Sequence, residues 1–87
     1  MGSRRIRGVR FRAISGDHAG GPIPHLHADI GAGEVVVELL PERIVRLSQL
    51  HRASVRGNVT QSERRRVLEI ARYAFDELIA LWEASQP

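Results

Sequence analysis

The sequence predicts an α+β fold in which a small antiparallel β-sheet is followed by one long C-terminal α-helix. Two observations carry this prediction. Over about residues 5–56, apolar and polar residues alternate with a period of two, which is typical of half-buried strands. Over about residues 61–84, apolar residues recur at a helical period behind a capping sequence. With 87 residues, the chain is expected to form one domain, residues 1–87, around a modest core.

The first predicted strand is RIRGVRFRAIS at residues 5–15, in which Val9, Phe11 and Ala13 share one face. Gly8 breaks this alternation, and we interpret it as a β-bulge. The following GDHAGGPIP segment contains three glycines and two prolines, so it is expected to be a loop.

A hairpin is predicted next. HLHADI at residues 25–30 alternates, with its apolar side chains inward and its histidines outward. A tight turn at residues 31–33 then leads into a strand at residues 34–40. Residues 42–54 are ambiguous between two short strands, or one bent strand, and a helix, because Ile44, Leu47 and Leu50 recur at three-residue spacing.

The C-terminal helix begins at Thr60-Gln61-Ser62-Glu63, which has the form of a capping box. Its apolar arc is wider than one face of a sheet requires. We therefore expect part of the arc to contact a second copy of the chain, as in a homodimer, or a cognate partner protein. The residues expected at this interface are Phe75, Leu78, Ile79 and Trp82.

All thirteen basic residues are arginine, and the formal net charge is +3. The planar guanidinium binds phosphate bidentately, so RNA or DNA is a candidate partner. The arginines expected to contact nucleic acid are Arg10, Arg12, Arg43 and Arg46. No apolar run reaches the roughly 20 residues of a membrane span, and the basic start lacks the apolar stretch of a signal peptide. We therefore expect a cytoplasmic protein without membrane contact.

Three of the four histidines lie in GDHAGGPIPHLHADIG, residues 16–31. Side chains at positions i and i+2 of a strand point the same way, so His25 and His27 are expected to project together into solvent. His18 lies at the other end of the loop, from which it can fold back over them.

Three interpretations of these histidines remain open. In the first, His18, His25 and His27 supply the general base and the general acid for cleavage of an RNA phosphodiester. In the second, His25 and His27 bind a divalent metal such as zinc, with Asp17, His18 or Asp29 as the third ligand. In the third, the histidines only hold the loop through hydrogen bonds.

The segment GDHAGGPIPHLHADIGAGEVVVEL resembles the signature of a small bacterial family, domain of unknown function 4160. That signature is Asp-His, a short proline-containing loop, Pro-His-aromatic-His, then Gly, an acidic residue and a strand, and later a helix ending in Glu-Leu and Trp. Two features depart from it, because Leu26 replaces the aromatic residue and the loop is longer. The matching residues are Asp17, His18, Pro24, His25, His27, Gly31, Glu34, Glu77, Leu78 and Trp82.

The resemblance implies a protein of a toxin–antitoxin type module, a class whose genes commonly lie beside another short gene. We therefore expect a small bacterial protein that acts on or binds a macromolecular partner, with RNA bound through a histidine and arginine surface. One alternative is a non-enzymatic antitoxin or oligomerising interaction module. Another is a metal-dependent hydrolase that uses His25 and His27.

Overall fold

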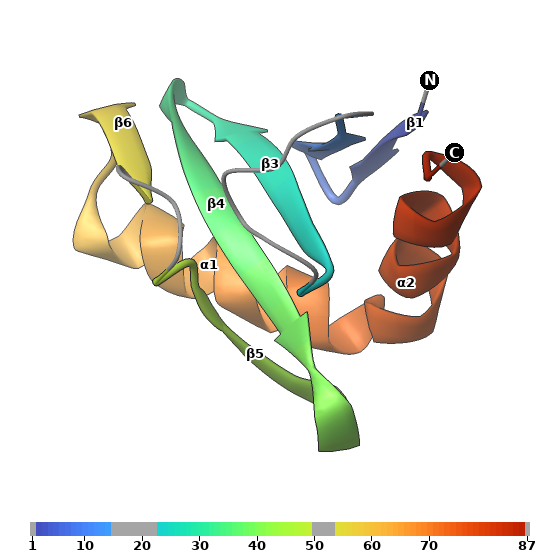
Figure 1. The fold of residues 1–87 in the computed structure, drawn as a ribbon. Coiled ribbons are helices and arrows are strands. Elements are labelled where there is room, and N and C mark those ends of the chain that lie inside the picture. Colours follow the sequence, from blue (N-terminus) through green and yellow to red (C-terminus); the bar gives the residue numbers. More distant parts are fainter. Residues whose placement is uncertain (1, 15–22, 50–53, 87) are drawn as a thin grey trace.

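The computed structural model describes residues 2–14, 23–49 and 54–86. As predicted, the fold is α+β, with two helices on one face of an antiparallel sheet (Figure 1). Within the described residues the strand order is β1-β2-β3-β4-β5, and β6 also pairs with β4. The strands are β1 (Gly2–Ile6), β2 (Val9–Ala13), β3 (His25–Ile30), β4 (Ala32–Leu40), β5 (Ile44–Leu47) and β6 (Val55–Asn58). The helices are the short 3-10 turn η1 (Pro41–Arg43), α1 (Gln61–Tyr73) and α2 (Phe75–Ala84).

The first predicted strand is a hairpin, and the interpretation of Gly8 as a bulge is wrong. β1 and β2 pair antiparallel, and Ile6 opposite Val9 closes a two-residue turn. Arg7 and Gly8 occupy this turn with φ angles of 51° and 86°. Left-handed φ at both central residues is what a type I′ turn requires, so the break in alternation is a reversal of the chain.

The β3–β4 hairpin and the strand at residues 25–30 are confirmed. β4 is long enough to pair with two further strands, β5 along its second half and β6 along its first. The interpretation of residues 42–54 as two short strands therefore holds at β5, and the helical alternative is wrong there. Residues 50–53, including Leu50, lie outside the described residues.

The capping box is confirmed. The Glu63 amide donates to the Thr60 hydroxyl at 3.0 Å, and the Thr60 amide donates to the Glu63 carboxylate at 2.9 Å. The single long helix is wrong, because helical geometry is interrupted at Ala74, where φ is −102° and ψ is 26°. α1 packs on β3, β4 and β5, whereas α2 packs on β1, β2 and β3. The change of direction lets two shorter helices follow the twisted sheet where one straight helix would leave it (Figure 1).

The residues expected at an intersubunit surface instead pack against the core of this chain. Leu78 is fully buried in the core, Phe75 and Trp82 are each 8% exposed, and Ile79 packs against the core. Two helices over two halves of the sheet use most of the wide apolar arc inside one molecule. The interface assignment is therefore corrected for Phe75, Leu78 and Trp82, whereas Ile79 stays partly exposed and remains a prediction. Neither α1 nor α2 is long and apolar enough to cross a membrane.

Candidate functional site on the outer face of the sheet

We call the face of the sheet that points away from α1 the outer face, and Trp82 of α2 reaches it at His25. Because strand residues alternate, Leu26, Ala28 and Ile30 of β3 face the helices, and the residues between them face outward. The register aligns the outward residues of neighbouring strands, so that Arg12 lies opposite His27 and Glu38 opposite His25. The outer face thus carries rows of polar side chains across the strands.

His25 and His27 lie on the same face, as predicted, with ring centroids 6.2 Å apart. The expectation that they project into solvent is wrong, because the two residues are only 1% and 6% exposed. The His25 ring lies 4.8 Å from the Trp82 ring, and its Nδ1 donates to the Ile23 carbonyl at 2.8 Å. Burial of these polar rings is tolerated because each one is hydrogen-bonded.

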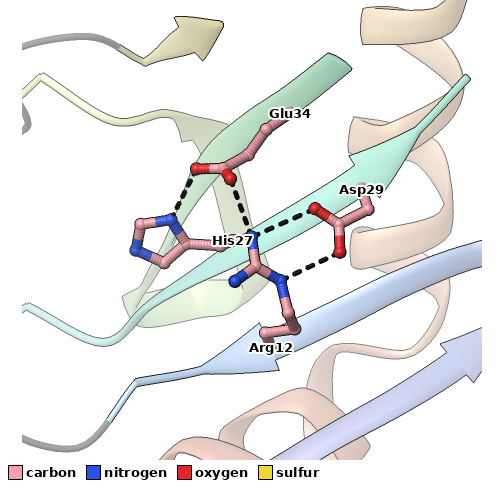
Figure 2. A network of polar contacts seen from close by, with 4 residues as sticks. All are labelled: Arg12, His27, Asp29 and Glu34. Carbon is pink, nitrogen blue, oxygen red and sulfur yellow. Dashed lines mark hydrogen bonds and ion pairs between the residues drawn. The ribbon is translucent and has the colours of Figure 1, made fainter. Parts of the chain in front are cut away.

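Figure 2 shows the polar network around His27, which joins β2, β3 and β4. Arg12 makes a bidentate contact with Asp29, at 2.9 Å from Nε and 3.0 Å from Nη2. Nη2 of Arg12 also donates to Glu34 at 2.7 Å, and the second oxygen of Glu34 lies 2.8 Å from His27 Nδ1. Glu34 therefore connects the guanidinium to the imidazole.

The network changes the proton affinity of its members. Burial raises the pKa of Glu34, but hydrogen bonds and charges from His27 and Arg12 lower it by more, so the pKa lies below its usual value. Burial lowers the pKa of Arg12, but Asp29 and Glu34 outweigh that effect and raise the pKa above its usual value. Both shifts favour the charged forms of these two groups.

We expect Glu34→Gln to lower the free energy of unfolding by about 2 kcal/mol at pH 7, because it removes charge-assisted hydrogen bonds. A carboxylate whose pKa is lowered in the folded state stabilises the fold above its unfolded pKa, and this contribution disappears as pH falls through the folded pKa. The difference between wild type and variant should therefore shrink between about pH 5 and pH 3.

Urea denaturation at several pH values measures this difference. Glu69→Gln is the matched control, because Glu69 is exposed and forms no ion pair within the described residues. A Glu34 effect of equal size at pH 3 and pH 5.5 would contradict the assignment.

A second network surrounds Glu38, a fully buried carboxylate in β4. It accepts hydrogen bonds from Arg46 Nε at 2.7 Å, from the Ser48 hydroxyl at 3.0 Å and from the Gln49 amide at 3.1 Å. Our sequence reasoning did not identify Glu34 or Glu38 as site residues. The available signal was two carboxylates spaced to share one face of an otherwise apolar strand, EVVVELL, since a charge there requires a partner.

The two histidines share a tautomer. A carbonyl oxygen can only accept a hydrogen bond, so His25 Nδ1, which lies 2.8 Å from the Ile23 carbonyl, carries a proton. The Glu34 carboxylate, with its lowered pKa, likewise accepts from His27 Nδ1. In both rings Nδ1 is therefore the nitrogen that donates in these contacts.

The four arginines predicted to contact nucleic acid have different surroundings in the structure. Arg12 and Arg46 contact buried or half-buried carboxylates on the outer face, whereas Arg43 pairs with Asp76 of α2 at 2.6 Å. Arg10 is exposed and lies opposite Asp29, which Arg12 already contacts. Arg56, which the sequence analysis did not single out, is exposed opposite Glu34 beside a shallow depression at the β3–β4 turn.

The metal interpretation is incomplete within the described part of the chain. Asp17 and His18 lie outside the described residues. Among the residues that are described, no group of three or more potential metal ligands is present. Three predicted ligands are placed, His25, His27 and Asp29, and the Asp29 carboxylate is held by Arg12.

No protein-family model, no curated protein and no solved structure matches this chain.

Proposed function

We propose that this chain is a small bacterial protein of the toxin–antitoxin type that binds RNA on the outer face and cleaves it with His27 as the general base. As part of the same proposal, the chain is a relative of the domain of unknown function 4160 family that it resembles, and it acts in the cytoplasm. The observation that carries it is the contact of Glu34 with both His27 Nδ1 and Arg12.

The Glu34–His27 contact supports proton transfer. A carboxylate on Nδ1 holds the imidazole in one orientation and stabilises the imidazolium that forms when Nε2 takes up a proton. In RNA, that proton comes from a ribose 2′-hydroxyl. The 2′-oxygen then attacks phosphorus, the bond to the 5′-oxygen breaks, and the products are a 2′,3′-cyclic phosphate and a 5′-hydroxyl.

The leaving 5′-oxygen needs a proton from a second group. His25 is the candidate, because its ring lies 6.2 Å from that of His27 on the same face. The two residues are 1% and 6% exposed, so the proposed reaction requires that RNA binding uncovers both rings. Arginines stabilise the charge that develops on the phosphoryl oxygens. Arg56 suits this role, because it is exposed and lies opposite Glu34 in the register of β4 and β6.

The test is His27→Asn. The asparagine amide can still donate toward Glu34, but it has no counterpart of Nε2. We expect cleavage of a single-stranded RNA oligonucleotide to fall by at least about 100-fold, a typical loss for a general base. RNA affinity, measured by fluorescence anisotropy, should remain within a few-fold of wild type, and the thermal midpoint checks folding. Cleavage at the wild-type rate by the folded variant would reject the proposal.

A metal-dependent hydrolase is the second candidate, and the shared tautomer favours it. Metal-binding histidines usually donate their other ring N–H to a carboxylate or a carbonyl, as His27 and His25 do here. The cleavage assay separates the two candidates, because the metal-free mechanism is unaffected by EDTA. Loss of activity in EDTA that zinc restores would favour the metal.

A further inference from the structure

Four arginines gather at the turn end of the β1–β2 hairpin, and we call them the arginine tip. Arg5 and Arg10 lie directly opposite each other, one pair away from the turn, and Arg10 shares the outward alternation of Arg12. Arg7 is in the turn itself, and Arg66 of α1 donates from Nη2 to the Arg7 carbonyl at 2.9 Å. All four are exposed, and none forms an ion pair within the described residues.

Two of these placements oppose local stability. Like charges directly opposite each other on neighbouring strands repel, as Arg5 and Arg10 do. Arg7 has a φ of 51°, a left-handed conformation that the first central position of a type I′ turn normally gives to Asn, Asp or Gly. The tip therefore departs from ordinary hairpin chemistry at two positions, both with arginine.

Neighbouring contacts hold the Arg7 side chain and backbone in place, but they do not neutralise the charge of the Arg7 guanidinium. The Arg7 guanidinium lies 4.2 Å from the centre of the Tyr73 ring, and Arg66 fixes the Arg7 carbonyl. A cation–π contact orients a guanidinium but leaves its charge and its N–H donors available to a ligand. Departures from local preference that the surrounding structure supports are concentrated at functional sites.

The tip adjoins the site described above. Arg10 is directly opposite Asp29, so it is the diagonal neighbour of His27 on the outer face. Such neighbours lie about 7–8 Å apart. When one group of a bound ligand contacts His27, the Arg10 guanidinium can therefore reach the next group of the same ligand. Arg12, which lies opposite His27, is neutralised by Asp29 and Glu34, whereas the tip arginines have no acidic partner within the described residues. A ligand that reaches from His27 to the tip is therefore favoured when it carries a negative charge at the tip.

We propose that the arginine tip binds the backbone phosphates of an RNA strand next to the phosphodiester at His27. This inference rests on the proposed function, and it assigns to that site a phosphate-anchoring region. Guanidinium groups bind phosphate oxygens bidentately, and each phosphate neutralised releases condensed counterions. The tip therefore supplies affinity, while His27 and its neighbours supply chemistry.

The sharpest test is Arg7→Asn. It creates an Asn-Gly pair, the preferred sequence of a type I′ turn, so the thermal midpoint should equal or exceed that of wild type. The affinity for a fluorescent single-stranded RNA oligonucleotide should nevertheless fall several-fold. Wild-type affinity in this folded variant would show that Arg7 contacts no phosphate and would overturn the inference for the turn.

The double variant Arg5→Gln, Arg10→Gln tests the two arginines that face each other on β1 and β2. Its control is the double variant Arg65→Gln, Arg72→Gln, which removes the same charge from exposed positions of α1 outside the tip. For the tip variant we expect an affinity loss of about tenfold or more and a salt-dependence slope that is smaller by about 1.4, or roughly 0.7 per lost phosphate contact on a single strand. Equal losses in the two double variants would indicate a general effect of net charge and would overturn the proposal.

The same measurements separate this inference from the proposed function. If wild type binds RNA through the tip but does not cleave it, the tip stands and the catalytic role of His27 fails. If wild type cleaves RNA and the tip variants bind it as tightly as wild type, the tip fails and the proposed function stands. If wild type binds no RNA, both fail.

Discussion

Replacement of Leu78 by alanine is expected to lower the free energy of unfolding by about 3 kcal/mol. Leu78 is 0% exposed and belongs to the cluster between α2 and the sheet. Truncation removes apolar contacts and leaves a cavity that the surrounding strands fill only in part. Urea denaturation monitored by circular dichroism measures the loss, and sedimentation of the folded variant should give the same mass as wild type.

Leu68→Ala is the matched control, because Leu68 lies on α1 and is only partly buried against the same core. Its effect should be clearly smaller. The opposite pattern, in which Leu78→Ala keeps its stability and changes the oligomeric mass, would place Leu78 at an intersubunit surface, as the helical arc alone suggests.

Replacement of Arg46 by methionine is expected to lower the free energy of unfolding by about 3 kcal/mol, because it leaves a charged carboxylate buried without its guanidinium. The Glu38 side chain is 0% exposed, whereas the Arg46 side chain is 38% exposed. Among the described contacts, the Ser48 hydroxyl and the Gln49 backbone amide also donate to Glu38, but a neutral donor does not replace the Arg46 cation. Thermal and urea unfolding measure the effect.

Arg43→Met provides the control within the same hairpin. Arg43 also forms a short ion pair, 2.6 Å from Asp76, but the two side chains are 59% and 74% exposed. Exposed pairs contribute little, so the cost should be about 0.5 kcal/mol or less. Similar costs for the two variants would mean that Glu38 gains no more from its arginine than a surface carboxylate does.

Local pattern was sufficient for several elements. The alternation of HLHADI predicts the strand, its inward side chains and the common face of His25 and His27, because these depend only on the two-residue period of extended chain. The capping box is also local, since its two hydrogen bonds join residues three apart. The Arg7-Gly8 turn was missed because arginine is an unusual residue at a left-handed position.

The surroundings of the candidate site depended on contacts between distant residues. His25 packs against Trp82, a residue far away in the sequence. Arg12, and not Arg10, contacts Asp29, and this choice depends on side-chain reach across the strands. The break at Ala74 has the same origin, since no glycine or proline marks it and the twisted sheet determines the direction of each helix.

The sequence by itself determined the α+β class, the strand that carries His25 and His27, and the start of α1, because each depends on periodicity or on neighbours a few residues away. Only the tertiary structure decided which carboxylate each arginine meets, how deeply the histidines are buried, and which arginines gather at the β1–β2 turn. Those features depend on strand register and on the packing of α2 against the sheet, which bring together residues that no local pattern connects.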